Sequence, residues 1–251
     1  MREVNQDQVI ECLRAIGIAH GDGLLCHSAI QFLGRPVDGV GMYLDAIQAV
    51  IGREGTLAAP TFNFAFARGE PYDPQETPSQ GMGAFSEYVR QHPDARRTLH
   101  PMQSLAVIGR YADDLASRDT LSAFDPGSAF ERMLELDFKL LLLGADVSAT
   151  SIYHVSEQRN QVPYRYWKDF SGLVRSNDGW HERTYRMYAR DLDLDPETTA
   201  APVQRLLEAR GQWRSVALNY GKIASCRLLD FVAAVDHFLK VDPWSLVLNR
   251  P

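Results

Sequence analysis

The stretch KLLLLGADVSATSIYHVSE, residues 139–157, decides the predicted fold. A run of leucines ends at Gly144, a turn rich in Asp, Ser and Thr follows, and a helix then begins. Strands that are apolar throughout and alternate with helices are typical of α/β proteins, because both faces of such strands are covered.

On this predicted helix, His154 and Glu157 lie three residues apart, so their side chains project from one face. A carboxylate beside an imidazole fixes the imidazole tautomer and favours its protonated form, which is the arrangement of a general base. An ordinary helix histidine that makes a surface ion pair has the same spacing. The pair is therefore interpreted together with the rest of the chain.

The bulk composition predicts a soluble globular protein. The 251 residues are 45% hydrophobic and 23% charged, which is ordinary for a globular domain. A net charge of −6 argues against a general nucleic-acid binder. The three cysteines have no paired spacing, which excludes a Cys-based zinc site and fits a reducing compartment. With no signal-peptide pattern and no apolar stretch of membrane-spanning length, we expect a cytoplasmic protein.

Periodicity along the chain extends this prediction to the fold. We expect helices near residues 5–16, 40–51, 84–90, 128–134, 203–210 and 229–239, and buried strands near 24–26, 56–59, 105–108 and 139–143. Residues 184–190 alternate between apolar and polar, which indicates a half-buried antiparallel strand. The predicted fold class is α/β (α+β mixed), with a central mixed sheet flanked by helices and a smaller C-terminal antiparallel-plus-helix subdomain. We expect one domain over 1–251, with a soft subdomain boundary near 160–172.

Short polar segments follow the expected strands, at turns where α/β proteins place ligands. Taken singly, each has an ordinary structural explanation, such as a strand-end histidine, a turn proline or a helix cap. Taken in order, they resemble the aminoglycoside 3-N-acetyltransferase (antibiotic acetyltransferase) family, from His27 to about Phe170. The matching segments are His27-Ser28, Gly39, Gly55-Thr56-Leu57, Pro60-Thr61, Gly83-Ala84-Phe85-Ser86-Glu87, Arg97-Thr98, His100-Pro101 with Ser104, Gly127-Ser128, Leu141-Leu142-Leu143-Gly144 and His154-x-x-Glu157.

Members of this family move an acyl group from coenzyme A to an amine. The resemblance implies that His154 is the general base for the acceptor amine, that Glu157 orients it, and that acetyl-CoA or another acyl-CoA is the co-substrate, with no metal. It also implies a coenzyme A site lined by His27, Ser28, Ala29, Thr98, Leu99, His100 and Ser104. A second serine is usual where Ala29 stands, and a serine where Thr98 stands. The chemistry suits the residues, because an ammonium must lose its proton before it attacks a thioester.

The segment after Glu157 bears on the acceptor. Between residues 158 and 190 there are seven Lys and Arg but three acids, interleaved with aromatic residues. A polycation would be repelled by such a surface, whereas a phosphate would be attracted. We therefore expect an amino sugar that carries a phosphate or nucleotide, bound by Thr61, Asp146, Tyr164, Arg165 and Lys168. The same cations could also form a solvated strand face or hold the phosphates of coenzyme A.

Other functions stay open. The first is an aminoglycoside 3-N-acetyltransferase that confers antibiotic resistance, and the second is a non-catalytic homologue that binds coenzyme A or a carbohydrate. A metal-dependent hydrolase would use His154 and Glu157 with His27 or His100 as ligands, although no His-Glu-x-x-His spacing occurs. We expect a small-molecule amine and an acyl-CoA as partners, neither nucleic acid nor membrane, and we leave a homodimer open.

Overall fold

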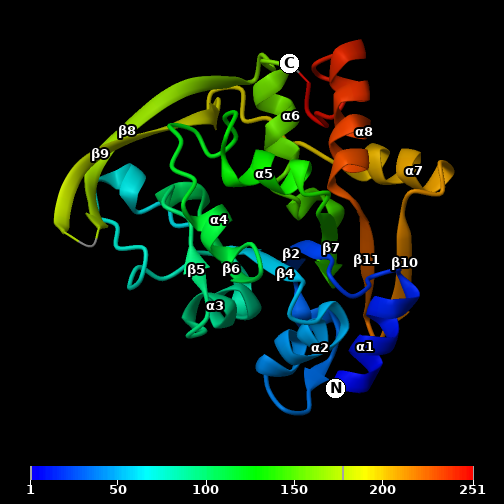
Figure 1. Cartoon of the computed structure of the whole chain (residues 1–251). Coiled ribbons are helices and arrows are strands. Elements are labelled where there is room, and N and C mark those ends of the chain that lie inside the picture. Colours follow the sequence, from blue (N-terminus) through cyan, green and yellow to red (C-terminus); the bar gives the residue numbers. More distant parts are fainter. Residues whose placement is uncertain (1, 177, 251) are drawn as a thin grey trace.

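The protein is described by a computed structural model, which covers residues 2–176 and 178–250 (Figure 1). Its centre is a seven-stranded mixed sheet with the order β10-β11-β7-β2-β4-β6-β5. The strands in chain order are β2 (Gly23–Ser28), β4 (Thr56–Pro60), β5 (Arg96–Arg97), β6 (Leu105–Gly109), β7 (Lys139–Leu143), β10 (Arg214–Leu218) and β11 (Gly221–Arg227). A short parallel pair, β1 (Glu3–Val4) with β3 (Arg35–Pro36), lies apart from this sheet.

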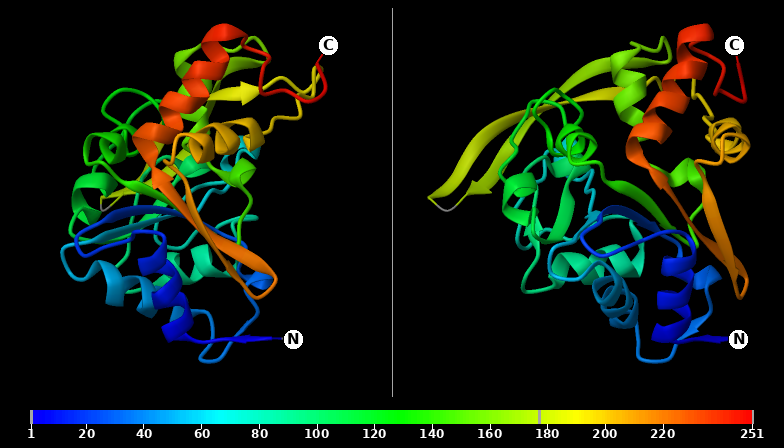
Figure 2. Two further views of the ribbon diagram at one scale, coloured as in Figure 1. Left: turned by 90° about the vertical axis from the view of Figure 1, so that its right-hand side faces the viewer. Right: turned by 45° about the vertical axis from the view of Figure 1, so that its right-hand side comes forward.

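Helices cover both faces of the sheet (Figure 2). Strand β7 is apolar throughout because its side chains pack against helices on both faces of the sheet. Leu141 and Leu143 face one helix layer, whereas Leu140 and Leu142 face the other. The first layer contains α1 (Gln6–Ala15), α2 (Gly41–Ile51) and α3 (Gly83–Gln91). The second contains α4 (Ala112–Ala116), α5 (Ala129–Glu135), α6 (Tyr153–Arg159), α7 (Ala201–Ala209) and α8 (Leu228–Val241).

A long antiparallel hairpin extends away from the central sheet, as the curved ribbon in Figure 1 shows. Its strands are β8 (Arg165–Ser176) and β9 (Gly179–Arg190), paired from Arg165 with Arg190 at the base. The hairpin carries a small apolar cluster in which Val174 and Tyr185 pack against Phe66 and Met102. The predicted antiparallel strand at 184–190 is therefore confirmed, as is the fold class.

The strands β10 and β11 were not predicted, and they join the central sheet beside β7. Because α7 and α8 pack in the same core as α5 and α6, most of the C-terminal segment shares its core with the rest of the chain. Within the described residues, none of the helices has the length and apolar character that crossing a membrane requires.

One edge of the sheet gathers the predicted site. Strands β2, β4 and β7 run parallel, so their carboxyl ends lie at the same edge. Gly144, which follows β7, has a φ of +72°, and a Cβ there would lie 2.6 Å from the carbonyl oxygen of Ala29. A glycine is needed for this close approach, which brings the chain after β2 against the turn that leads into α6.

Candidate active site

The first part of the site is a histidine that rests on a buried carboxylate. In α6, the Glu157 side chain is completely buried, while the His154 side chain is 32% exposed. The His154 Nδ1 lies 2.5 Å from Glu157 Oε2. Because Nδ1 is engaged by the carboxylate, Nε2 is the ring nitrogen left to exchange a proton with a bound molecule. The structure therefore excludes the surface ion pair that the spacing alone had left open.

Arg165 completes the surroundings of Glu157. Its Nε lies 2.8 Å from Glu157 Oε2, and its Nη1 donates a hydrogen bond to the carbonyl oxygen of Tyr188 at 3.1 Å. Burial on its own would raise the pKa of Glu157, but the charges and hydrogen bonds of His154 and Arg165 outweigh burial and lower it. The sequence placed Arg165 among acceptor ligands, whereas the structure places it against Glu157 beneath His154.

His27 lies at the end of β2, close to the same site. Its Nε2 is 3.2 Å from the backbone nitrogen of Ser151 and 3.3 Å from the Ser151 hydroxyl. A backbone N–H can only donate, so Nε2 accepts and the neutral ring carries its proton on Nδ1. Burial, and then the charge of His154, lower the pKa of His27 to about 3. His27 is therefore a neutral N–H donor at this edge, next to the partly exposed Ser28 and Ala29.

Three further predicted residues form a buried corner around Arg97. The side chains of Thr61 and Ser104 are completely buried, and Arg97 Nε donates to the hydroxyl oxygens of both at 3.1 Å. Thr98 accepts a hydrogen bond from the backbone nitrogen of Leu105 at 2.8 Å. The hydroxyl groups of Thr61, Ser104 and Thr98 thus fix the loop before β6, and none of these side chains is open to solvent in the structure.

His100 and Leu99 connect this corner to the hairpin. His100 is buried, its Nε2 lies 3.3 Å from the carbonyl oxygen of Arg186, and its ring packs edge-on against Tyr185 at 5.0 Å. Leu99 lines a hollow of about 1070 Å³ between the hairpin and β5, together with Arg97 and Arg175. Of the residues predicted to line the coenzyme A site, Leu99 borders this hollow, which on its other side contacts Ser176 and Gly179, at the end of the hairpin opposite Arg165.

The other predicted acceptor ligands lie in different surroundings. Asp146 is exposed and accepts a hydrogen bond from the backbone nitrogen of Ser148 at 2.9 Å. Tyr164 is completely buried, with its ring 5.3 Å from that of Trp244, so it faces the core in this structure. Lys168 is exposed on β8, with its Nζ 5.3 Å from the centre of the Phe170 ring.

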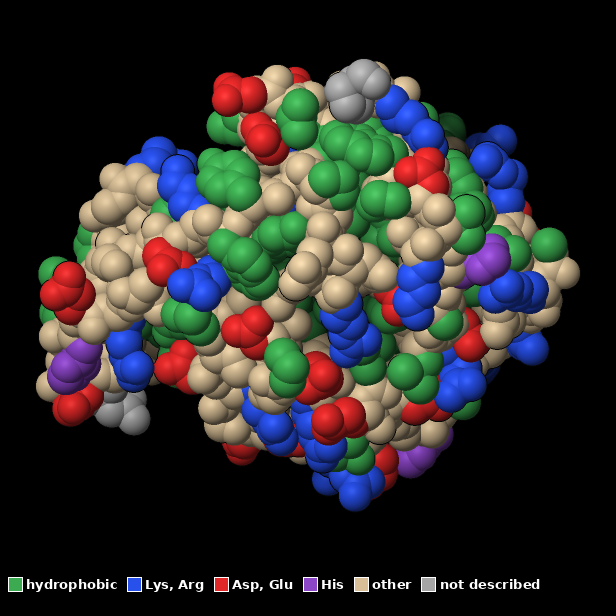
Figure 3. All heavy atoms as spheres, turned by 90° about the horizontal axis from the view of Figure 1, so that it is seen from above, with side chains coloured by type: hydrophobic (Ala, Val, Ile, Leu, Met, Phe, Trp, Pro, Cys, Tyr) green, Lys and Arg blue, Asp and Glu red, His purple; other side chains and the backbone are tan. Residues whose placement is uncertain are grey.

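The cations after Glu157 are largely compensated by carboxylates, five of them from outside residues 158–190. Six of the seven have a carboxylate within 4 Å. The pairs are Arg159–Glu131, Arg165–Glu157, Arg175–Asp73, Arg183–Asp119, Arg186–Asp169 and Arg190–Asp195. Figure 3 likewise shows basic and acidic side chains interspersed over the face it presents. A phosphate-bearing acceptor was expected because of a local excess of positive charge. These six ion pairs contain no such excess.

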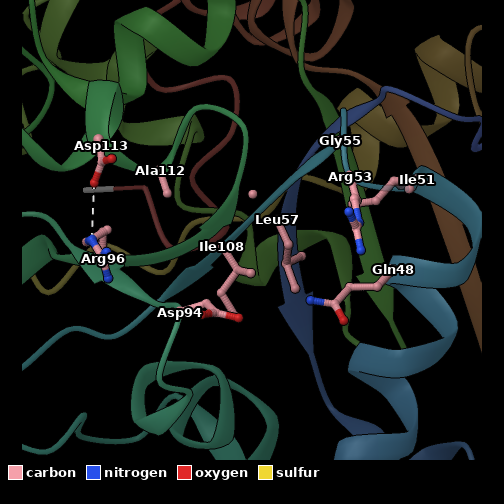
Figure 4. Close-up of a pocket in the computed structure, with 12 residues that line it drawn as sticks. Gln48, Ile51, Arg53, Gly55, Leu57, Asp94, Arg96, Ile108, Ala112 and Asp113 are labelled. Carbon is pink, nitrogen blue, oxygen red and sulfur yellow. Dashed lines mark hydrogen bonds and ion pairs between the residues drawn. The ribbon is translucent and has the colours of Figure 1, made fainter.

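A second hollow, of about 480 Å³, lies at the other end of the strands (Figure 4). Leu57 and Ile108 line it between charged side chains, and Arg96 pairs there with Asp113 at 3.1 Å. It borders Gly55, which precedes β4, whereas Thr61 follows the end of that strand, roughly 16–20 Å away at the rise of a strand. This hollow is thus separate from the dyad of His154 and Glu157. Within the described ranges, no group of three or more His, Cys, Asp or Glu side chains has the arrangement of a metal site.

A mixed α/β sheet that presents a histidine on a buried, ionised carboxylate defines a protein suited to proton transfer. A family model described as aminoglycoside 3-N-acetyltransferase matches residues 25–240. Aminoglycoside N(3)-acetyltransferase III from Salmonella sp is 27% identical over 192 residues, which are 69% of this chain and about two thirds (67%) of that protein.

Two solved structures show the same fold. AAC-IIIb in a binary complex with CoASH has a TM-score of 0.84 at 20% identity, covering 96% of this chain and 97% of that chain. A histidine-to-alanine variant of AAC(3)-IVa in complex with apramycin has a TM-score of 0.80 at 24% identity, covering 98% and 96%.

The chain belongs to the aminoglycoside 3-N-acetyltransferase family. The resemblance found in the sequence and the predicted enzyme class, an acyl-CoA-dependent N-acyltransferase, are thereby confirmed.

Proposed function

We propose that this protein transfers the acetyl group of acetyl-CoA to the 3-amino group of an aminoglycoside. The observation that carries the proposal is the dyad: His154 Nδ1 is held by a buried carboxylate, so that Nε2 is the proton-accepting nitrogen. The names of the matched family and relative support the acceptor, as does the apramycin complex of the structural relative. An aminoglycoside now replaces the phosphate-linked amino sugar as the preferred acceptor, because the cations that favoured phosphate are paired.

The reaction needs a base and no protein nucleophile. The neutral acceptor amine attacks the thioester carbonyl carbon, and His154 Nε2 takes the proton that the nitrogen loses as the C–N bond forms. The C–S bond breaks, and the coenzyme A thiolate receives that proton, so the products are the N-acetylated amine and coenzyme A. Glu157 keeps Nδ1 protonated throughout and stabilises the imidazolium that exists between the two proton transfers.

For the acyl donor we propose the edge predicted from the sequence, from the turn after β2 to the segment around Leu99. His27 supplies a neutral N–H in this region, suited to an oxygen acceptor on the donor. The buried hydroxyls of Thr61, Thr98 and Ser104 would then act indirectly, by holding the loop before β6 in place.

Thiol release tests the proposal. Acetyl-CoA, and longer acyl-CoA donors, would be offered with aminoglycosides, unmodified amino sugars, and phosphorylated or nucleotide-linked amino sugars. We expect turnover with aminoglycosides and its loss in His154→Ala. Turnover confined to nucleotide-linked amino sugars would show that the proposed acceptor, an aminoglycoside, is wrong. Coenzyme A binding without thiol release for any amine would instead indicate the non-catalytic homologue. A cytoplasmic location and a homodimer stay predictions from the sequence.

A further inference from the structure

One oxygen atom of Glu157 serves two side chains. Oε2 lies 2.5 Å from His154 Nδ1 and 2.8 Å from Arg165 Nε. The Arg165 Nη2 also lies 3.3 Å from that same Nδ1. The side chain of Glu157 is completely buried, and that of Arg165 is 12% exposed. A guanidinium therefore lies directly beside the imidazole, where little water screens its charge.

The protonation of these three groups follows from their contacts. Glu157 is ionised, because its pKa is lowered although burial opposes this. The proton in the short contact between Nδ1 and Oε2 thus belongs to Nδ1. A nitrogen that donates its proton in this way cannot also accept one from Arg165. The contact between Nη2 and Nδ1 is therefore a close approach of a cation to the ring.

We propose that Arg165 is a positioning residue that shares the Glu157 carboxylate with His154 and thereby holds the imidazole in its neutral, proton-accepting form. With a neutral imidazole, the charges of Glu157 and Arg165 cancel. A second proton on the ring would create a net positive charge in a buried place, against the repulsion of Arg165. The carboxylate alone would favour the imidazolium, and Arg165 offsets this preference.

The other groups that surround His154 in the described structure leave this balance intact. His27 stays neutral, since burial is the main cause that lowers its pKa to about 3. The hydroxyls of Tyr153, Tyr164 and Tyr188 also stay neutral, because burial raises the pKa of each. Asp125 is engaged by other groups, since it accepts hydrogen bonds from Gln158 Nε2 at 2.8 Å and from the backbone nitrogen of Ser122 at 2.9 Å. Glu157 and Arg165 are thus the charges in direct contact with the ring.

The test is the pH dependence of His154 in Arg165→Gln. We expect the midpoint of the His154 imidazole titration, followed by NMR and assigned with His154→Ala, to rise by about one unit or more relative to the wild type. The midpoint of the kcat/KM profile should rise with it, which costs activity at neutral pH and restores it at higher pH. Arg165→Lys, which keeps the charge, should leave both midpoints near those of the wild type.

Arg190→Gln is the matched control, because Arg190 is the partner of Arg165 across the hairpin but pairs with Asp195 at 3.5 Å and is half exposed. It should leave the titration unchanged. Should Arg165→Gln fail to fold, the double variant Glu157→Gln/Arg165→Gln leaves no unpaired buried charge. Its imidazole should titrate above that of Glu157→Gln alone.

This inference rests on the proposed function for its meaning in catalysis, but the NMR titration needs no substrate. If no amine is acetylated and the midpoint still rises, the proposed function fails and the role of Arg165 stands. If Arg165→Gln lowers the rate while both midpoints stay in place, the role of Arg165 in tuning His154 is wrong. Arg165 would then merely tether the hairpin through the carbonyl oxygen of Tyr188.

Discussion

Replacing Glu157 by Gln removes the buried charge on which the candidate site is built. The amide has almost the same shape and can still accept a hydrogen bond from His154 Nδ1. It cannot compensate the Arg165 guanidinium, which is 12% exposed and lies 2.8 Å from the carboxylate oxygen. We therefore expect Glu157→Gln to fold less stably and to turn over more slowly than the wild type.

The size of the stability loss follows from this geometry. Two unit charges about 4 Å apart attract by about 4 kcal/mol at an effective dielectric constant of about 20. Removing one partner of a buried pair typically costs about 3–5 kcal/mol, since the other charge stays buried alone. Because the amide retains some hydrogen bonding, we expect about 3 kcal/mol at pH 7. In a chain of this length, that corresponds to a fall in Tm of roughly 6–12 °C.

The loss should also depend on pH in a definite direction. The pKa of Glu157 is lowered in the folded protein, so its charge stabilises the fold above the unfolded pKa of about 4.3. This contribution is lost as the pH falls through the lower, folded pKa. The stability difference between wild type and Glu157→Gln should therefore be complete at pH 6–7 and shrink below about pH 4.

Urea unfolding at several pH values measures this difference. Asp169→Asn is the matched control, because it makes the same carboxylate-to-amide change in the exposed pair with Arg186 and should have little effect. Thiol release should show a rate at pH 7 about 10–1000-fold below that of the wild type, since the amide no longer stabilises the imidazolium. Equal stability of Glu157→Gln and wild type at pH 7 would refute the reasoning, because Arg165 would then need no buried counter-charge.

Three further outcomes follow from the structure. His154→Ala should slow acetyl transfer by at least about 100-fold while calorimetry shows unchanged coenzyme A binding, because the base acts on the acceptor; wild-type turnover would contradict the mechanism. Gly109→Ala should lower the free energy of unfolding several times more than Gly127→Ala. Both glycines have positive φ, but a Cβ at Gly109 would lie 2.2 Å from the Gly55 carbonyl oxygen, whereas Gly127 has open space. If urea unfolding shows equal losses of stability for the two variants, the backbone around Gly109 moves to accommodate the Cβ, and the prediction is wrong. Finally, the stability of the wild type should fall as the pH drops below about 6.5. His27 and His100 have pKa values of about 3 and about 4 in the folded protein, so they stay unprotonated at pH values at which the same histidines in the unfolded chain bind protons. His27→Gln or His100→Gln should each make the loss of stability between about pH 6.5 and 4 smaller, and an unchanged slope would count against their burial as neutral rings.

The central strands and most helices were predictable because their signals are local. The leucines of β7 are apolar on both faces since helices cover both, and Gly144 marks its end. The hairpin of β10 and β11 was missed because β10 is an exposed edge strand whose side chains are mostly polar or half-buried. A turn at Asn219, which has a φ of +54°, was the available signal for it.

The dyad was predictable from a spacing of three residues on one helix, but its character was not. Whether Glu157 forms a surface pair or a buried one depends on the packing of α6 against α8, which are far apart in the sequence. The contact of Arg165 with Glu157 depends in turn on where β8 begins, at the base of the hairpin. These are tertiary properties, and no periodicity in one segment reports them.

The prediction of the acceptor also depended on tertiary contacts that one segment of the sequence does not report. Seven cations against three acids in residues 158–190 predicted a surface that attracts phosphate. Five of the six carboxylates that pair with those cations lie outside that segment, at Asp73, Asp119, Glu131, Glu157 and Asp195. Opposite charges within 4 Å largely cancel beyond about a Debye length of 8–10 Å, so the field at a bound acceptor is set by the folded arrangement. A count of charges along one segment therefore cannot decide whether a polycation or a phosphate is favoured there.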